Sequence, residues 1–223
     1  MLVSAITARV AETLQDDSNV TWTAAQLIEW INDALRALVS ARPDVSVVTA
    51  SVELTANSTK QVLSAATDLR FIDATRNMGT DGLTPGRTVR LGDKTALDAF
   101  VPGWHSETGQ AAVKEFMFDE ARPREFWVYP RTHATTPMYL EVIKQVMPAT
   151  ITAVGNTLPV DETYAPVLID WMLWRSFSRD SENTPNAQRA GSHRASFYQQ
   201  LGIKMPADVS VNPKVREAME KQA

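Results

Sequence analysis

The sequence predicts an α+β protein in which N- and C-terminal helices pack as a helical bundle, beside a central antiparallel β-rich region and an extended C-terminal arm. Apolar residues recur with helical spacing up to Pro43, then mostly alternate, and return to helical spacing after Pro159. These changes of period divide the chain. We expect a discontinuous helical domain over residues 1–44 and 160–203, a β-rich domain over 45–159 and an arm over 204–223.

The clearest element is a helix over residues 24–41. Thr23 is a favourable N-cap, and Gln26 three residues later completes a capping box. Trp22 and Leu27 have the spacing of a hydrophobic staple. One apolar stripe follows, made of Leu27, Trp30, Ile31, Ala34, Leu35 and Leu38. A helix with such a stripe and no reactive groups is built to dock against other elements. A shorter amphipathic helix over residues 3–15 precedes it, with Ile6, Val10 and Leu14 on one face.

The central region predicts short strands joined by turns. The expected strands are residues 45–55 (one strand or a bulged pair), 61–63, 69–74, 88–91, 113–118, 125–129 and 138–146. Residues 61–63 are placed to return as the partner of 45–55. Residues 113–118 and 125–129 predict a hairpin, with 138–146 completing a meander. A short helix over 94–100, capped by Asp93, interrupts the strands.

Two further helices follow Pro159 and predict an αα-hairpin. Thr163 is the expected N-cap of the first, because it places Pro166 where a missing N–H costs nothing. This helix is apolar around much of its circumference, so we expect it to be central. The second runs from an N-cap at Thr184 to Gly202 at C′. Its expected inner face consists of Ala187, Ala190, Arg194, Phe197, Tyr198 and Leu201.

Composition and charge exclude several classes of protein. With 223 residues and 44% hydrophobic content, the chain can bury a hydrophobic core without disulfides or structural metal ions to stabilise it. The absence of cysteine removes disulfides, thiolate nucleophiles and zinc–thiolate sites. A formal net charge of −4 disfavours a dedicated nucleic-acid binder. No apolar run reaches membrane-spanning length, and the N-terminus lacks the features of a signal peptide.

The motifs that usually mark catalysis are missing or incomplete, so we predict no enzyme, catalytic residue, metal or cofactor. His105, His133 and His193 lack a second ligand at metal-binding spacing. The loop over residues 82–88 has one residue too few between its glycines for a phosphate-binding loop, and arginine replaces the lysine. No G-x-S-x-G is present, and the pairs Asp16/Asp17 and Asp119/Glu120 fall in turns, where carboxylates are normally solvated.

Two sets of surface candidates remain open. Trp104 follows Pro102-Gly103 in a loop, and it is either an anchor for that loop or a contact with another subunit, where tryptophan is enriched. Five arginines lie around loops and strand ends: Arg87, Arg90, Arg122, Arg124 and Arg131. These arginines are either a basic strip that lies near DNA or part of a solvated surface. Neighbouring acidic residues cancel much of their positive potential, which favours the solvated surface.

The order of several sequence blocks resembles the adaptor, or head-to-tail connector, proteins of tailed bacteriophages. The resemblance is closest to the adaptors of short-tailed phages that are similar to tail tubular protein A. The blocks are residues 22–39 (WTAAQLIEWINDALRALV), 42–44 (RPD), 76–87 (RNMGTDGLTPGR), 102–105 (PGWH), 115–130 (EFMFDEARPREFWVYP), 168–180 (LIDWMLWRSFSRD) and 186–190 (NAQRA). Their order and spacing, rather than any single block, carry the resemblance.

The resemblance implies a structural virion protein. Such adaptors form a ring beneath the portal protein, commonly of twelve copies, which extends the DNA channel and docks the tail nozzle or tail tube. It further implies a homo-oligomer that is assembled in the cytoplasm of the bacterial host. Genomic DNA is expected to pass through this ring without specific binding. No membrane partner is expected. The slight acidity of the chain agrees, because basic walls would hold DNA electrostatically.

Two surfaces are candidates for partner contacts. One is the polar face of the 24–41 helix, with Glu29, Asn32, Asp33 and Arg36. The other is the arm, whose isolated apolar residues suit a segment that orders on a partner: Met205, Val209, Val211, Val215 and Met219. Trp104 is the third candidate contact.

Three alternatives stay open. A tail-completion or minor capsid protein of a tailed phage would share this composition and lack of chemistry. A phage hydrolase is disfavoured by the missing catalytic groups, and a DNA-binding regulator by the missing basic face.

Overall fold

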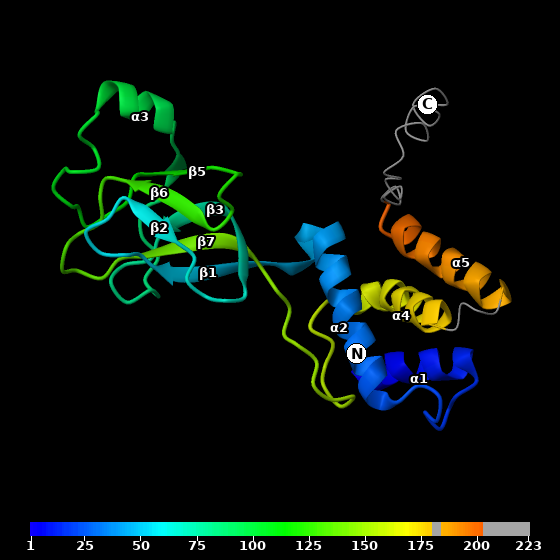
Figure 1. Cartoon of the computed structure of the whole chain (residues 1–223). Coiled ribbons are helices and arrows are strands. Elements are labelled where there is room, and N and C mark those ends of the chain that lie inside the picture. The colour runs from blue at the N-terminus through cyan, green and yellow to red at the C-terminus, as the bar shows by residue number, and fades with distance from the viewer. Residues whose placement is uncertain (180–183, 203–223) are drawn as a thin grey trace, which may run out of the picture. The chain divides into compact units, whose positions relative to one another are not determined.

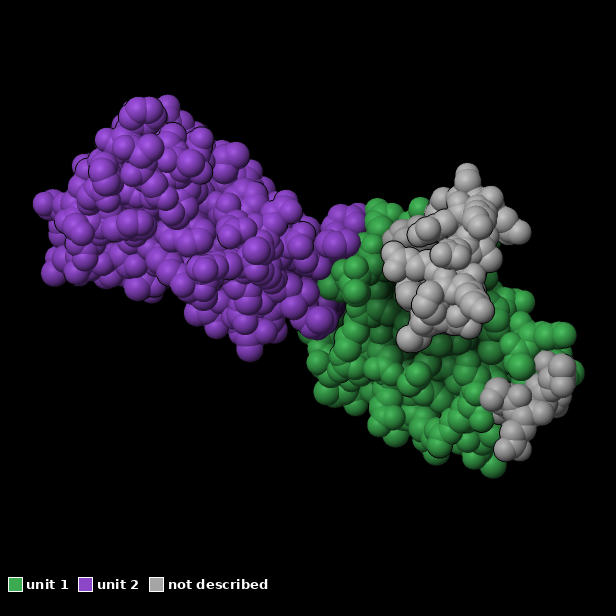
Figure 2. Space-filling model, turned by 45° about the horizontal axis from the view of Figure 1, so that its top comes forward, with its two compact units in different colours: residues 1–42, 149–223 green, residues 43–148 purple. Residues whose placement is uncertain are grey.

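The chain divides into two compact units. The computed structural model describes residues 1–179 and 184–202. Unit 1 combines residues 1–42 with the chain from 149 onward, and unit 2 comprises residues 43–148 (Figures 1 and 2). Helices predominate in unit 1 and strands in unit 2, so the predicted α+β class is confirmed. Residues 149–159, which we had assigned to the β-rich region, lie in unit 1.

The first two helices of unit 1 are α1 (Val3–Leu14) and α2 (Ala24–Ala41). The predicted capping box is confirmed: Thr23 Oγ1 accepts from the backbone N–H of Gln26, and Gln26 Oε1 accepts from that of Thr23. All six residues of the predicted stripe of α2 are buried. Trp22 lies against Trp30, with ring centroids 5.3 Å apart. The sequence therefore defines both the beginning and the buried face of α2.

Helix α4 (Ala165–Arg179) is central in unit 1, as predicted, because it packs against α1, α2 and α5 (Thr184–Gln200). The hairpin of α4 and α5 is confirmed, and Gly202 adopts the left-handed conformation (φ +67°) expected after a helix. Trp171 of α4 packs on Phe197 of α5, at 4.8 Å between centroids.

Two details of the αα-hairpin differ from the prediction. A short 3-10 turn, η2 (Glu162–Tyr164), precedes α4, and its capping residue is Asp161 instead of Thr163. Asp161 Oδ1 accepts the backbone N–H of Thr163 at 2.8 Å. An aspartate carboxylate that accepts the N–H two residues later in the chain can cap the helix as well as a threonine hydroxyl does. On α5, Ala187 is exposed, whereas Ala190, Phe197 and Leu201 are buried.

The segment 149–159 is fixed to α1 and α2 by hydrogen bonds. Asn32 of α2 donates to the carbonyl of Ile151 at 2.8 Å and accepts its N–H at 2.9 Å. The carbonyls of Asn156 and Val154 accept the N–H groups of the first two residues of α1. These N–H groups have no partner within their own helix, so the segment caps α1.

Unit 2 begins with a 3-10 turn, η1 (Pro43–Ser46), and contains two sheets. The first has the order β1-β7-β3, from β1 (Val47–Glu53), β7 (Tyr139–Val146) and β3 (Asp68–Asn77), all antiparallel. The second has the order β2-β6-β5-β4, from β2 (Lys60–Val62), β6 (Glu125–Tyr129), β5 (Glu115–Phe118) and β4 (Arg90–Leu91). Its β4–β5 pair is parallel and the others are antiparallel.

Strand pairing contradicts two predictions. The hairpin of β5 and β6 is confirmed, with Glu115 opposite Tyr129. However, β7 does not complete a meander with it, since β7 lies between β1 and β3 in the other sheet. Likewise β2 pairs with β6 and not with β1. Within the 45–55 segment, residues 47–53 form one strand rather than a bulged pair, and residues 45–46 belong to η1.

The alternation of side chains along β5 and β6 explains how unit 2 packs. Phe116, Phe126 and Val128 face a core shared with the first sheet, where Phe71 stacks on Phe126 at 4.4 Å. Met117 and Trp127 point the other way and pack with Trp104, Leu97 and Val101. Helix α3 (Lys94–Phe100), capped by Asp93 as predicted, and the loop after it therefore cover the outer face of the second sheet (Figure 1).

Candidate functional site

The polar face of α2 carries three of the predicted interface residues. Glu29 and Arg36 are exposed and Asp33 is half-buried. Asp33 accepts from Arg36 Nη1 at 3.0 Å and from Arg175 Nη2 of α4 at 3.4 Å. Solvent-exposed ion pairs of this kind contribute roughly 0–1 kcal/mol, so they can be exchanged for pairs with a partner at little cost.

Asn32 does not belong to this face in the way that we expected. Its amide is committed on both sides, to Ile151 and to the carbonyl of Ile28 at 2.9 Å. The side chain thus holds unit 1 together and offers no free group to a neighbour.

Trp104 has no exposed surface. Its Nε1 donates to Asp98 Oδ1 of α3 at 2.9 Å, and its ring packs on Met117 and Trp127. The pKa of Asp98 is lowered by Lys94 first and by this hydrogen bond second. A buried ring offers no area to a partner, so the structure favours the loop-anchor interpretation over the subunit contact.

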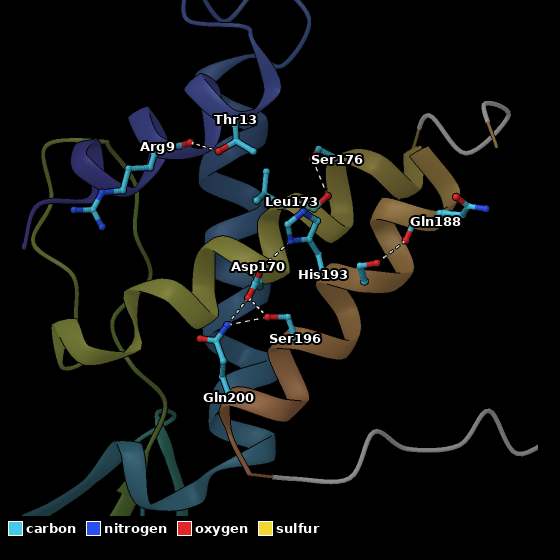
Figure 3. Close-up of polar contacts among 10 residues, drawn as sticks. Arg9, Thr13, Asp170, Leu173, Ser176, Gln188, His193, Ser196 and Gln200 are labelled. Carbon is cyan, nitrogen blue, oxygen red and sulfur yellow. Dashed lines mark hydrogen bonds and ion pairs between the residues drawn. The ribbon is translucent and has the colours of Figure 1, made fainter. Parts of the chain in front are cut away.

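A polar cluster that the sequence does not predict lies between α4 and α5 (Figure 3). Asp170 of α4 accepts from His193 Nδ1 at 2.7 Å, from Ser196 Oγ at 2.6 Å and from Gln200 Nε2. His193, Ser196 and Gln200 follow one another on one face of α5, at spacings of three and four residues. That spacing is the only signal in the sequence, and it does not reveal which helix carries the acceptor.

This cluster contains aspartate, histidine and serine but not the geometry of a catalytic triad. In a triad the histidine lies between the carboxylate and the serine hydroxyl. Here Ser196 donates directly to Asp170, so His193 has no serine proton to remove. Burial raises the pKa of Asp170, but the hydrogen bonds from His193 and Ser196 and the charge of His193 together outweigh it, so the pKa is lowered. The cluster thus serves to join α4 to α5.

The other histidines also have structural partners. His105 Nδ1 lies 2.7 Å from Thr59 Oγ1, and His133 Nδ1 accepts from the N–H groups of Thr135 and Thr136. Across the described residues, no three His, Cys, Asp or Glu side chains are grouped so that they could hold a metal ion.

The glycine-rich loop 79–86 is ordered by one aspartate. Asp81 accepts from the N–H groups of Leu83 and Thr84 and from the Thr84 hydroxyl. These hydrogen bonds lower the pKa of Asp81 from 3.8 to about 2. The carboxylate occupies the backbone donors that a phosphate would need, which agrees with the interpretation of this segment as a connecting loop.

Comparison with known proteins identifies the family. A search of curated protein sequences gave no match. The family model described as SU10 adaptor protein matches residues 1–217, nearly the whole chain. The chain belongs to the SU10 adaptor protein family. The resemblance to phage head-to-tail adaptors is thereby confirmed, and an SU10 adaptor protein is a structural component of the phage particle.

Most loop arginines of this SU10 adaptor protein are engaged within unit 2. Arg124 donates to the carbonyls of Leu63 and Ala65, and Arg131 to that of Asn57. Arg90 pairs with Glu115, and Arg122 with Glu125 at 3.5 Å. Their charges and donors stabilise turns and strand ends, which agrees with the solvated-surface interpretation rather than a DNA-facing strip.

The five apolar arm residues of the adaptor, Met205, Val209, Val211, Val215 and Met219, lie outside the described residues. Of the helices that the structure describes, none has the length and apolar character required to span a membrane.

Proposed function

We propose that the protein is a head-to-tail adaptor that forms a ring beneath the portal, extends the DNA channel and provides the docking surface for the tail. Membership of the SU10 adaptor protein family over residues 1–217 carries this proposal. Its partners are the portal protein, a tail nozzle or tail tube protein and further copies of itself, twelve in the ring. The ring is assembled in the cytoplasm of the bacterial host.

The division into two units supports a role between two different partners. Unit 1 presents helices and unit 2 presents strands and loops, so the chain has two surfaces of unlike chemistry. The net charge of −4 suits a channel wall, because each basic contact to phosphate would slow the passage of DNA. Genomic DNA therefore passes without specific binding.

Neighbouring copies contact one another through Glu29, Asp33 and Arg36 on α2. We expect the charge reversals Asp33→Lys and Arg36→Glu together to reduce ring formation on purified portal at least tenfold, while circular dichroism stays unchanged. Asp33 also pairs with Arg175, and the single change Arg36→Glu leaves this internal pair intact. Arg36→Glu should therefore also reduce ring formation, which separates loss of the contact between copies from loss of the Asp33–Arg175 pair. Normal rings from the double variant would contradict this assignment.

The arm over residues 204–223 anchors the adaptor to the portal or to a neighbouring copy. Deletion of these residues should leave a folded chain that no longer assembles on portal rings. Electron microscopy of portal rings mixed with the full-length or the truncated chain measures the fraction of portal rings that each chain decorates. Equal decoration by both chains would exclude the arm from assembly, and no decoration by the full-length chain would favour a tail-completion or minor capsid role.

A further inference from the structure

Unit 2 contains an apolar groove of about 330 Å³ at the end where β1 begins. Its apolar lining comes from η1, three strands and the β5–β6 turn: Pro43, Val47, Phe71, Ile72, Phe118 and Pro123. Val47 is 38% exposed and Phe118 is 39% exposed. These two side chains border the groove and leave apolar area that a partner can cover.

Acidic side chains surround this groove. Asp44, Asp119, Glu120 and Glu125 are among the lining residues, with Arg70 as the basic one. Glu125 already holds Lys60 at 2.9 Å, and Asp119 accepts the N–H of Ala121. Glu120 is exposed and has no ion pair within the described part of the chain. The groove therefore fits a ligand that combines apolar side chains with positive charge.

One segment of the chain has this chemistry. Residues 211–216 read Val-Asn-Pro-Lys-Val-Arg, with apolar side chains at 211, 213 and 215, two cations and no anion. In an extended conformation alternate residues share a side, and the residue before a proline favours that conformation. Val211, Pro213 and Val215 can then enter the groove while Lys214 and Arg216 meet the acidic rim.

We propose that the groove of unit 2 receives residues 211–216 of a second copy of the chain. This rests on the proposed ring, because an arm that enters the groove of the next copy is a head-to-tail contact, and such contacts generate a ring where the rotation between copies closes. The eight residues between Gly202 and Val211 reach up to roughly 27 Å when extended, which permits the arm to leave its own unit 1. The proposal gives the arm a defined receiving site.

Cross-linking tests this directly, since the chain has no cysteine of its own. Full-length chains carrying Val215→Cys and chains carrying Val47→Cys, with tags of different size, are mixed and oxidised, alone and on portal rings. We expect the yield of the mixed disulfide to be at least fivefold higher than the yield from a matched pair of chains, in which Leu83→Cys replaces Val47→Cys. Leu83 is 79% exposed in the same unit but does not line the groove.

A charge exchange separates specific docking from chance collision. Glu120→Lys in the groove should lower the cross-linking yield at least fivefold, and Lys214→Glu in the arm should restore it. Equal yields at Val47 and Leu83, or no rescue, would overturn the proposal. So would a disulfide that forms only within one chain carrying both cysteines. Decoration of portal rings, scored in the same samples, tests the proposed function separately: rings without the cross-link would refute only the groove.

Discussion

At the residue scale, short polar side chains organise the connections of both units. Asp16 accepts the N–H groups of Val20, Thr21 and Trp22, and the hydrogen bond from Trp22 is the largest influence lowering its pKa. The sequence indicates only a solvated carboxylate pair at Asp16 and Asp17. Aspartate and asparagine bind nearby backbone groups readily, but the sequence does not show whether they bind locally or across the fold.

Asn32 allows a sharp test of this point. We predict that Asn32→Leu lowers the free energy of unfolding by about 1–3 kcal/mol, because the N–H and carbonyl of buried Ile151 lose their partner. Urea denaturation followed by circular dichroism measures the change. Glu29→Gln, at an exposed position of the same helix, is the control and should stay within about 0.5 kcal/mol of the parent. A similarly small effect for Asn32→Leu would show that Ile151 does not depend on this amide.

At the element scale, the helices and the β5–β6 hairpin were predictable, and the partners of strands far apart in the sequence were not. The boundaries of α2 follow from groups close in sequence, namely a cap, a stripe and Pro43, and all act within the helix or directly beside it. The pairing of β7 with β1 and β3 depends on contacts more than 60 residues apart, as in Ala74 opposite Val142. Alternation in a strand indicates a buried face but does not identify the neighbouring strand.

The cap of α2 gives the prediction at this scale. Thr23→Ala should lower the free energy of unfolding by about 1 kcal/mol, because the N–H of Gln26 loses its acceptor. Thermal or urea unfolding monitored at 222 nm checks this. Thr21→Ala is the matched control, since the exposed Thr21 precedes the helix and contributes only its backbone N–H to Asp16. Equal stability of the two variants would mean that the capping box is not a source of stability here.

At the scale of the whole molecule, both units contain carboxylates whose pKa is lowered in the folded state. Asp170 in unit 1 and Glu141 in unit 2 are examples, the latter through hydrogen bonds from Arg76 and Thr75. A group with a lowered folded pKa stabilises the fold above its unfolded pKa, and this stabilisation is lost as the pH falls through the folded pKa. The relevant window runs from about pH 4 down to about pH 2, where Asp81 titrates.

We therefore predict that the free energy of unfolding changes little from pH 7 to 5 and falls steadily below pH 4. Denaturation curves at several pH values measure it. Asp170→Asn should make the free energy of unfolding of unit 1 depend less steeply on pH, because one titrating group is removed. Helix content reports on the unfolding of this unit. A loss of stability that starts near pH 6 would contradict this prediction and would indicate histidine protonation instead.

The candidate interfaces were less predictable than the fold. Burial of Trp104 requires Met117 and Trp127, which come from strands later in the chain, so a loop tryptophan alone could not distinguish an anchor from a contact. The exposure of Glu29 and Arg36 followed from the helical period. The Asp170 cluster and the unit 2 groove arise only when separate elements meet, and the sequence shows at most the spacing of His193, Ser196 and Gln200 on α5.

The construction of unit 1 from two distant stretches of chain has a consequence during translation. Helix α2 leaves the ribosome about 120 residues before α4, and α1 leaves earlier still. At bacterial rates of roughly 5–20 residues per second this is a delay on the order of ten seconds. Unit 2 is continuous and can fold within that interval. During this interval the apolar stripe of α2 remains exposed, because α4 has not yet been synthesised. Nascent chains are therefore most susceptible to chaperone binding or to aggregation at this stage.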